Sequence, residues 1–333
     1  MAALALNLAP LPVPEVMFGM AQARLLMAGV ELGVFSALSG VNLRAEVLAT
    51  QLKLHPDGLL HVLECLTAMG YLRHQGPTYT LRARARKWLD PASPTYVGTF
   101  LRFNYAQWNW WSSLEEVVRT GHHHAIHESA PQDERWALYI RAMFELARLS
   151  ADEVAAAVKV PDGATRLLDV AGGHGWFASR ICLRNPGLRG TVFDLPGSAR
   201  AGRLILEEMG GAARVEHREG DLFTDDLGGP YDVILFFQTL RHFTPAQNEG
   251  TFRRFYEHLR PGGTLAVLDY LSPEVGEAPD GGSVVGLHYW LTTGGARYPA
   301  SALREVLNRV GFTVKRERKI LRLPYQKLFI CSR

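Results

Sequence analysis

The sequence predicts an α/β protein with a smaller helical domain in front of the sheet. The central observation is residues 166–196, which have the pattern strand, glycine-rich turn, helix, strand and terminal acid. A second observation is that apolar strands and helices alternate from residue 166 onward, which is typical of a parallel sheet. A third is the series of three helices and a β-hairpin over residues 22–81, the pattern of a winged helix.

Composition places the chain among ordinary globular proteins. Its 333 residues are enough for two domains, and 47% hydrophobic with 21% charged residues is a usual balance for a soluble protein. The net charge of +3 is too small to indicate a nucleic-acid or membrane partner, and no apolar run reaches a membrane-spanning length. The first 18 residues lack a basic start and contain prolines, so we expect an ordered arm rather than a signal peptide. Cys65, Cys182 and Cys331 have apolar neighbours, which predicts buried thiols in a reducing cytoplasm.

The N-terminal domain is predicted to mediate dimerisation rather than DNA binding. Helices are expected at 22–38, 45–52 and 56–69, followed by a hairpin that turns at Gly76-Pro77. The third helix would be the DNA recognition helix, but it has no Lys or Arg for phosphates. The apolar helices from Met20 onward need a partner to cover them, so a homodimer is favoured.

Residues 82–158 connect the two halves. We expect a basic linker over 82–90 and then an aromatic helix in which Trp108 and Trp111 lie one turn apart. Such aromatics fit either a core or the wall of a pocket for a flat ligand, and both interpretations stay open. The histidines of 121–127 lack acid or cysteine neighbours, so a solvated loop is favoured over a metal site. Residues 136–158 are predicted to be one bridging helix.

The sheet domain has the features of a nucleoside site. The turn Ala171–Gly175 follows a buried strand, and glycines there let a ligand approach the backbone closely. Asp194 ends the next strand, where an acid can accept both hydroxyls of a ribose. Asp221-Leu222-Phe223 follows strand 215–219, with apolar residues that can flank a purine. Ligands of such sheets bind beyond the carboxyl ends of the strands, so Gly173, Asp194, Asp221 and Arg241 should converge.

The remaining elements complete a seven-stranded sheet. Strands are expected at 231–237 and 264–271, with a helix between them that begins at Thr244-Pro245, an N-cap followed by proline. The last two strands, 313–321 and 326–331, have the spacing of a hairpin and predict an antiparallel edge.

Several motifs together carry a family resemblance. The DLP at Asp194, the GDLF at Gly220 and the RPGG at Arg260 resemble those of class I S-adenosylmethionine-dependent methyltransferases. With the winged-helix start and the LHYWLTTGGARY at Leu287, the chain is similar to the dimeric small-molecule O-methyltransferases, which include plant caffeate and hydroxyindole enzymes and bacterial natural-product tailoring enzymes. The resemblance extends from about Gln22 to Cys331.

The resemblance implies a three-part organisation. Residues 1–98 would form a winged-helix dimerisation domain, 99–158 a helical linker and substrate-pocket segment, and 159–333 a Rossmann-like methyltransferase domain with a mostly parallel seven-stranded sheet. The implied cofactor is S-adenosylmethionine, with no resident metal, and the N-terminal arm would reach into the partner's pocket. The implied cofactor-binding residues are Asp169, Gly173, Gly175, Asp194, Leu195, Asp221, Leu222, Phe223 and Phe237. The implied acceptor-binding residues are Phe103, Trp108, Trp111, Met143, His288 and Tyr289.

The catalytic position departs from the family pattern. The family has a His base in the loop after the fourth strand, but Arg241 holds that place here, followed by His242. Arginine stays protonated in proteins, so it cannot act as a general base. The family also flanks its His with two glutamates, and the matching positions hold Asp269 and Arg297. We therefore name Arg241, His242 and Asp269 as the candidate catalytic residues.

Three accounts of the reaction remain open. Methylation could rely on alignment alone, with Arg241 binding an acceptor that is already ionised or attacks through carbon. His242 could instead take over as base, or the cofactor could assist a decarboxylation, hydroxylation or rearrangement without methyl transfer. A metal held by His242 and His288 is a further idea, and an Arg241–Asp269 ion pair is compatible with every account.

The favoured function is O-methylation of a small aromatic or anionic secondary metabolite, and C-methylation is the alternative. The non-enzyme alternative is a winged-helix regulator that senses the cofactor.

Overall fold

The computed structural model describes residues 13–128, 130 and 132–333. Contacts divide the chain into one compact unit ending at Tyr105 and a second unit from Ala106 to Arg333, so the division falls inside an aromatic helix, α6. Most of the expected N-terminal arm lies outside the described residues. Among the helices that the structure describes, none is long and apolar enough to cross a membrane.

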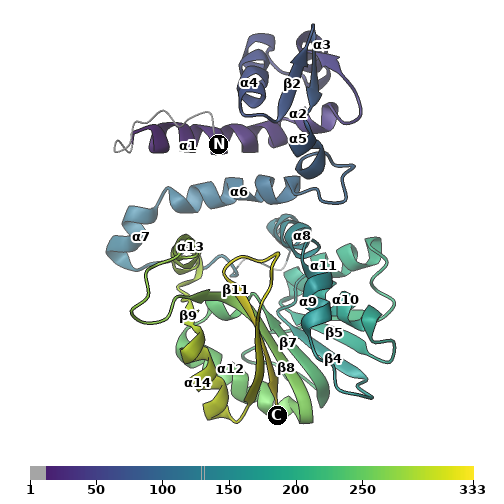
Figure 1. The fold of residues 1–333 in the computed structure, drawn as a ribbon, viewed down its shortest axis with the longest axis vertical. Helices are drawn as coiled ribbons and strands as arrows, with labels where there is room; N and C mark the ends of the chain where they lie inside the picture. The colour runs from purple at the N-terminus through teal and green to yellow at the C-terminus, as the bar shows by residue number, and fades with distance from the viewer. Residues whose placement is uncertain (1–12, 129, 131) are drawn as a thin grey trace. The chain divides into compact units, whose positions relative to one another are not determined.

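The N-terminal unit contains five helices and a small antiparallel sheet of order β1-β3-β2 among its described residues (Figure 1). The elements are α1 (Val13–Glu31), α2 (Val34–Ala37), β1 (Leu43–Arg44), α3 (Ala45–Leu52), α4 (Pro56–Ala68), β2 (Leu72–Gln75), β3 (Thr78–Leu81) and α5 (Ala83–Trp88). The hairpin turns at Gly76-Pro77 as predicted. Two predictions were wrong in detail. The first helix breaks at Gly33, whose φ of 78° interrupts it, and the expected basic linker contains α5.

The core of this unit forms where α4 turns one face inward. Leu59, Leu63 and Leu66 recur at helical spacing and are buried against Phe35. Cys65 lies on the other face and is exposed, so the prediction of a buried thiol was wrong for it, while Cys182 and Cys331 are buried. On α1 a run of apolar side chains is left exposed: Val16 (66%), Met17 (58%), Phe18 (45%) and Met20 (56%).

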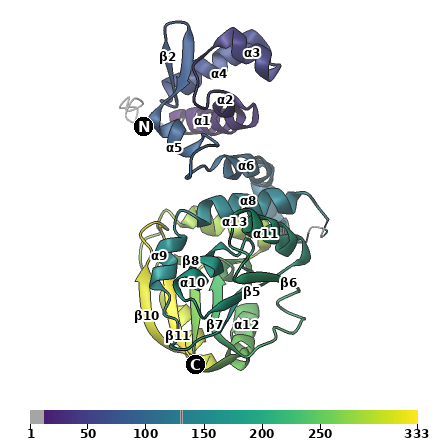
Figure 2. The ribbon, with the colours of Figure 1, turned by 90° about the vertical axis from the view of Figure 1, so that its right-hand side faces the viewer.

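The C-terminal unit is built on a mixed sheet of order β10-β11-β8-β7-β4-β5-β6, with β9 pairing β8 off this path. The strands are β4 (Arg166–Val170), β5 (Arg189–Asp194), β6 (Val215–Glu219), β7 (Tyr231–Phe237), β8 (Leu259–Ser272), β9 (Tyr298–Pro299), β10 (Thr313–Lys319) and β11 (Gln326–Ser332). Strands β6, β5, β4, β7 and β8 are parallel, and β11 is antiparallel to both of its neighbours. Figure 2 shows β10 and β11 at one edge and β6 at the other, which confirms the predicted antiparallel edge.

Helices cover both faces of the sheet. One apolar layer joins α9 and α10 to the strands, and a second joins α12 and α14 to the opposite face (Figure 1). The helices after the N-terminal unit are α6 (Gly98–Trp111), α7 (Leu114–Thr120), α8 (Arg135–Ala147), α9 (Ala151–Ala157), α10 (Trp176–Arg184), α11 (Pro196–Glu208), η2 (Leu240–His242), α12 (Pro245–His258), α13 (Ser283–Thr293) and α14 (Ala300–Val310). The single helix expected over 136–158 is therefore two helices, α8 and α9.

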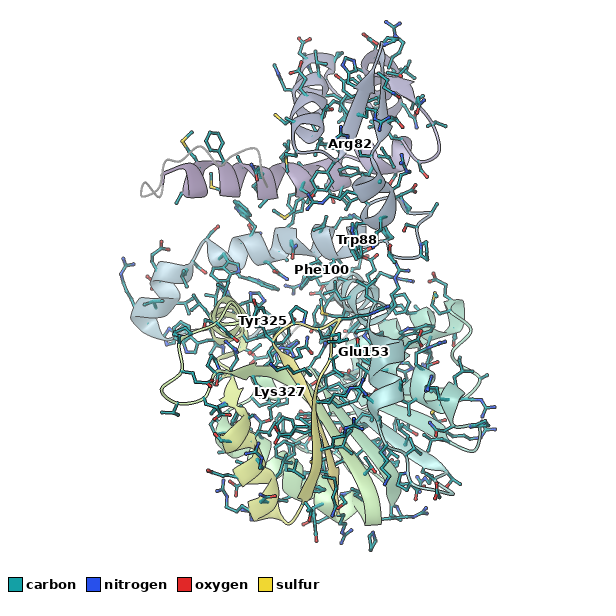
Figure 3. The ribbon with its side chains drawn as sticks, viewed as in Figure 1. Arg82, Trp88, Phe100, Glu153, Tyr325 and Lys327 are labelled. Carbon is teal, nitrogen blue, oxygen red and sulfur yellow. The ribbon has the colours of Figure 1, made fainter. Side chains whose placement is uncertain are left out.

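Polar contacts hold the ends of these elements. The predicted N-cap at Thr244 is confirmed, because Thr244 and Gln247 form a reciprocal capping box at the start of α12. Glu153 on α9, labelled in Figure 3 with Tyr325 and Lys327, accepts hydrogen bonds from the backbone N–H groups of Leu321 (2.6 Å) and Arg322 (3.2 Å). This contact ties the β10–β11 connection to the helix layer that precedes the nucleoside site.

Candidate active site

A cavity of about 630 Å³ lies at the carboxyl ends of β4, β5 and β7, where the sheet topology predicts a ligand. Gly173, Asp194, Asp221 and Arg241 all line it, so the four groups expected to converge do so. Further predicted residues on its wall are Asp169, Leu195, Leu222, Phe223, Phe237, Met143 and His242. The wall also contains residues that the sequence did not suggest, among them His127, Trp136, Tyr139 and Ile140.

The glycine-rich turn brings bare backbone to the cavity. Gly173 has a φ of 51° and donates its N–H to Asp194 Oδ2 at 2.7 Å. At Gly172 a Cβ atom would lie 2.4 Å from Cγ of Asp169, so no side chain fits there. Ala171 adopts a φ of 54°, which is costly for a residue with a Cβ. Gly175 is the N-cap of α10 and does not line the cavity, so its position fits the start of a helix.

Two acids in this wall lack a cation. Asp169 is 1% exposed, and neither of its oxygens accepts a hydrogen bond of normal geometry from the described residues. Burial and the nearby charge of Asp194 raise the pKa of Asp169 to about 8. Burial also raises the pKa of Asp194 to about 6, although the backbone N–H groups of Gly173 and Leu195 oppose this shift. The pair therefore suits a ligand that brings positive charge to one acid and hydroxyl donors to the other.

The next strand ends complete the nucleoside side. Asp221 accepts the backbone N–H of Phe223 at 2.8 Å, which shapes the turn after β6. The Phe223 ring packs edge-on against Phe243 with centroids 4.9 Å apart, and both rings line the cavity. Phe237 and Gln238 line it at the end of β7, and Gln238 has a φ of 56°. Flat apolar rings beside an acid are an arrangement that can hold a purine nucleoside.

Arg241 is locked into the protein. It lies in the 3₁₀ turn η2, is 5% exposed, and donates from Nη1 to Asp269 Oδ1 at 2.8 Å and from Nη2 to the Tyr289 hydroxyl at 3.0 Å. Burial alone would lower the pKa of Arg241, but the attraction of Asp269 outweighs it and the pKa is raised. Asp269 is absent from the cavity wall because it lies against Arg241. The Arg241–Asp269 ion pair considered in the sequence analysis is present, and it keeps Arg241 charged.

His242 pairs with a histidine from a distant segment. His127 Nε2 and His242 Nδ1 are 3.2 Å apart, and both residues line the cavity. The prediction that residues 121–127 form only a solvated loop was therefore wrong for His127, because this segment is docked on α13. The backbone N–H groups of His124 and Ile126 donate to the carbonyls of Leu291 and Thr292. The one sequence hint was the apolar Ala125-Ile126 before His127.

The histidines near Arg241 are held neutral. Burial, together with the charge of Arg241, lowers the pKa of His127 to about 4 and that of His288 to about 4. The pKa of His242 is lowered well below its usual value, first by burial and then by His127, Arg241 and His288. At neutral pH each ring therefore keeps one unprotonated nitrogen.

Of the six residues expected around the acceptor, only Met143 lies on the cavity wall. Met143 lines the cavity, whereas Trp111 stacks on His288 with centroids 6.1 Å apart. Tyr289 contacts His288, His242 and Arg241, so these rings form a layer next to the wall. Trp108 belongs to the same unit but is not on the cavity wall, and Phe103 belongs to the N-terminal unit, where it is buried.

The second position matched to a family glutamate has another role. The guanidinium of Arg297 pairs with Asp280 at 3.1 Å and donates to the Leu271 carbonyl, so it does not orient His242. Within the described ranges no group of three or more His, Cys, Asp or Glu side chains could hold a metal ion. The ring nitrogen of His242 that has a partner faces His127 rather than His288.

Comparison with known proteins matches this geometry. A model of the O-methyltransferase domain matches residues 111–313, and a model of the O-methyltransferase dimerisation domain matches residues 15–91. The mitomycin biosynthesis 6-O-methyltransferase of Streptomyces lavendulae is 30% identical, with 91% of this chain and 89% of the relative aligned. The 3-hydroxy-5-methyl-1-naphthoate 3-O-methyltransferase of Streptomyces sahachiroi is 25% identical over the same shares.

A solved structure extends the likeness to the whole fold. Human N-acetylserotonin methyltransferase in complex with S-adenosylmethionine superposes with a TM-score of 0.83 at 20% identity, covering 96% of each chain. The predicted fold class, the family resemblance and the family's cofactor, S-adenosylmethionine, are thereby confirmed. The chain belongs to the O-methyltransferase family.

Proposed function

We propose that this protein transfers the methyl group of S-adenosylmethionine to a hydroxyl of a small, flat secondary metabolite. The observation that carries the proposal is that one cavity joins the nucleoside wall to a wall of histidine and aromatic side chains. Its volume of about 630 Å³ is in the range of ligand pockets. A cofactor and an acceptor bound there would have neighbouring reactive atoms, which is the main requirement for a displacement reaction.

The nucleoside wall fits the cofactor in charge and shape. Asp194, Asp221, Phe223 and Gly173 line the cavity, which supports the proposed roles: Asp194 accepts the ribose hydroxyls, Asp221 and Phe223 frame the adenine, and Gly173 lets the methionine part pass. Asp169, a buried acid that accepts no hydrogen bond of normal geometry from the described chain, fits the cofactor's ammonium group. Bound there, the cofactor supplies an activated methyl group on a sulfonium. The chain's own contribution is to hold that group and to neutralise part of its charge.

The opposite wall fits a flat acceptor. Trp136 and Tyr139 supply ring surfaces, Met143 supplies an adaptable apolar contact, and His242 supplies a ring nitrogen. Trp111, His288 and Tyr289 keep their proposed part in acceptor binding as the layer next to this wall. The parts proposed for Trp108 and Phe103 rest on the family resemblance alone. The relative that methylates a hydroxynaphthoate suggests the size class of the acceptor.

We propose His242, not Arg241, as the base. Arg241 cannot accept a proton, and its two terminal nitrogens already donate to Asp269 and Tyr289. This disfavours the first account of the reaction, in which Arg241 binds an acceptor that is already ionised. His242 is neutral at pH 7 and lines the cavity, so it can take the hydroxyl proton as the oxygen attacks. A lowered pKa makes it a mild base, which favours acceptors whose hydroxyl is more acidic than that of a simple phenol.

The working form is proposed to be a cytoplasmic homodimer. The dimerisation-domain match includes α1, on which Val16, Met17, Phe18 and Met20 are exposed. An exposed apolar run of this kind needs cover, and a second copy of the same unit would supply it.

Labelled S-adenosylmethionine tests the proposal. The protein is incubated with a panel of hydroxynaphthoates, hydroxyquinones and phenols, and S-adenosylhomocysteine and the labelled product are quantified. We expect one S-adenosylhomocysteine per product and a methyl ether in its NMR spectrum. A methyl group on carbon would establish C-methylation instead. Product formed while the cofactor stays unspent would refute methyl transfer and favour a cofactor-assisted decarboxylation, hydroxylation or rearrangement.

A further inference from the structure

We propose that His127 is a positioning residue that fixes His242 in the tautomer competent to accept a proton from the acceptor. The inference rests on the proposed function, because it assigns a partner to the proposed base. The two residues are separated by 115 positions in the chain and meet through His127 Nε2 and His242 Nδ1, 3.2 Å apart. They form a histidine pair where the family resemblance implies a histidine oriented by carboxylates.

The geometry assigns roles to the ring nitrogens. Nδ1 of His242 is occupied by His127, whereas Nε2 of His242 makes no hydrogen bond to any residue that the structure describes. If His242 Nδ1 carries the proton and donates it to His127 Nε2, the lone pair of His242 Nε2 is left for the acceptor. In the reverse arrangement His127 donates, His242 Nε2 carries a hydrogen, and His242 cannot act as a base.

Electrostatics favours the first arrangement. A neutral imidazole has its negative end at the nitrogen without hydrogen, so a positive charge bound near His242 Nε2 favours the lone pair at that nitrogen. The charged or titratable groups that face the pair are Arg241, Tyr289 and His288 beside His242, and Tyr139 and Arg241 beside His127. Among the described residues no carboxylate shifts the pKa of either ring, and Asp269 is engaged by Arg241. His127 is therefore the group available to hold the His242 Nδ1 proton.

Packing keeps His127 in place for this role. Its ring lies nearly parallel to Trp136 (23°, centroids 6.4 Å apart) and contacts Tyr139 at 5.8 Å. The ring of His242 stands edge-on to both His127 and Tyr289, each at 4.7 Å. Two imidazoles clamped between aromatic rings lose little further freedom when their hydrogen bond forms, which is what a preorganised base requires.

The proton balance of the step is simple. The acceptor O–H proton passes to His242 Nε2 as the oxygen–carbon bond forms and the carbon–sulfur bond breaks. His242 becomes an imidazolium that still donates from Nδ1 to His127. Since burial and Arg241 disfavour that cation, it gives its proton to solvent once the product leaves.

A spectroscopic test needs no acceptor. In ¹⁵N-histidine NMR spectra at pH 7, taken with and without S-adenosylmethionine, we expect His242 to show a protonated Nδ1 and an unprotonated Nε2. His242→Gln and His127→Phe assign the signals, and in His127→Phe we expect His242 to become a mixture of tautomers. A protonated Nε2 on His242 in the cofactor complex would overturn the inference, whatever the enzyme assay shows.

A kinetic test separates positioning from packing. The two probes are 2-naphthol, whose hydroxyl is neutral at pH 7, and 2-hydroxy-1,4-naphthoquinone, whose hydroxyl is ionised. His127→Phe should slow methylation of 2-naphthol by roughly 100-fold, the low end of the effect of a general base, and slow the quinone reaction little. His127→Gln, whose side-chain oxygen can accept from Nδ1, should restore much of the lost rate. Equal slowing of both probes by His127→Phe would indicate a packing role and refute the inference.

The controls keep two failures apart. His124 lies three residues away on the same segment, bonds to Ser113 and is not on the cavity wall, so His124→Phe should leave both rates unchanged. If wild-type protein releases S-adenosylhomocysteine with none of the acceptor panel, the proposed function fails. The tautomer measurement still decides the inference about His127 in that case.

Discussion

Two buried acids at opposite ends of the sheet differ in their polar partners. At the amino end, Asp232 accepts the backbone N–H groups of Thr165 (2.8 Å) and Arg166 (2.9 Å) and pairs with Arg260 at 2.7 Å. At the carboxyl end, Asp169 is buried more deeply (1% exposed, against 9% for Asp232) and has no hydrogen bond of normal geometry from the described chain. Burying an uncompensated carboxylate is costly, so an acid left in this condition indicates where a ligand completes the structure.

Arg241 and Asp269 give a third case, which refines the comparison. They lie at the carboxyl end, yet their charges are paired within the chain. The position that holds the base in the family is thus occupied here by a structural ion pair, and the proposed base function moves to the neighbouring His242. Pairing of the charge within the chain, more than location in the active-site loop, separates Arg241 and Asp269 from Asp169, although Arg241 Nε has no hydrogen-bond partner among the described residues.

The largest expected effect comes from removing one partner of the Arg241–Asp269 ion pair. Arg241→Met removes the cation and leaves Asp269 buried without it, so we expect a loss of about 3–5 kcal/mol in the free energy of unfolding. Urea denaturation followed by circular dichroism measures it. The double variant Arg241→Met/Asp269→Leu removes both charges and should recover most of that loss. A single variant as stable as the wild type would show that Asp269 does not depend on Arg241.

A smaller loss of stability is expected from changing Asp232, the paired acid at the amino end of the sheet. Asp232→Asn weakens three charge-assisted contacts, so it should cost about 1.5–3 kcal/mol at pH 7. The hydrogen bonds from Thr165 and Arg166 and the pairing with Arg260 outweigh burial and hold the pKa of Asp232 below its usual range. Its contribution is therefore present at neutral pH and is lost only as the pH falls below about 4. A constant deficit from pH 5 to 8 in urea titrations is the expected result, and a deficit confined to acid pH would contradict it.

Asp169, the acid without a partner of normal geometry in the described chain, should give stability the opposite pH dependence. The pKa of Asp169 is raised to about 8 in the folded apo protein, against about 4 in an unfolded chain, so the folded state binds the extra proton. Stability of the apo protein should then fall as the pH rises from about 4 to about 8. Asp169→Asn cannot ionise, so it should flatten this slope while weakening S-adenosylmethionine binding at least 10-fold in calorimetric titrations. An unchanged slope would show that Asp169 is already stabilised as an anion.

The same contrast explains how much the sequence could predict. Strand β7 was predicted residue for residue, because a short apolar run between turn residues specifies a buried strand locally. The bounds of β6, which is polar and only partly buried, were also predicted, because strands and helices alternate in this part of the chain. The cavity acids were predicted because each lies at or just after the carboxyl end of a strand. The breaks between α1 and α2 and between α8 and α9 were missed, since apolar spacing continues across them. His127 was missed because its partner is 115 residues away, a separation that local patterns do not encode.

The smallest expected effect concerns backbone strain at Ala171, at the carboxyl end of the sheet. Ala171 lines the cavity with a φ of 54°, a conformation that costs about 1–2 kcal/mol for a residue with a Cβ. Ala171→Gly removes this cost but adds about 0.5–1 kcal/mol of chain entropy to the unfolded state, so a net gain of up to about 1 kcal/mol is expected. Ala178→Gly in α10, buried and helical, is the matched control and should destabilise the protein. If both variants lower the urea midpoint equally, the turn at Ala171 stores no strain.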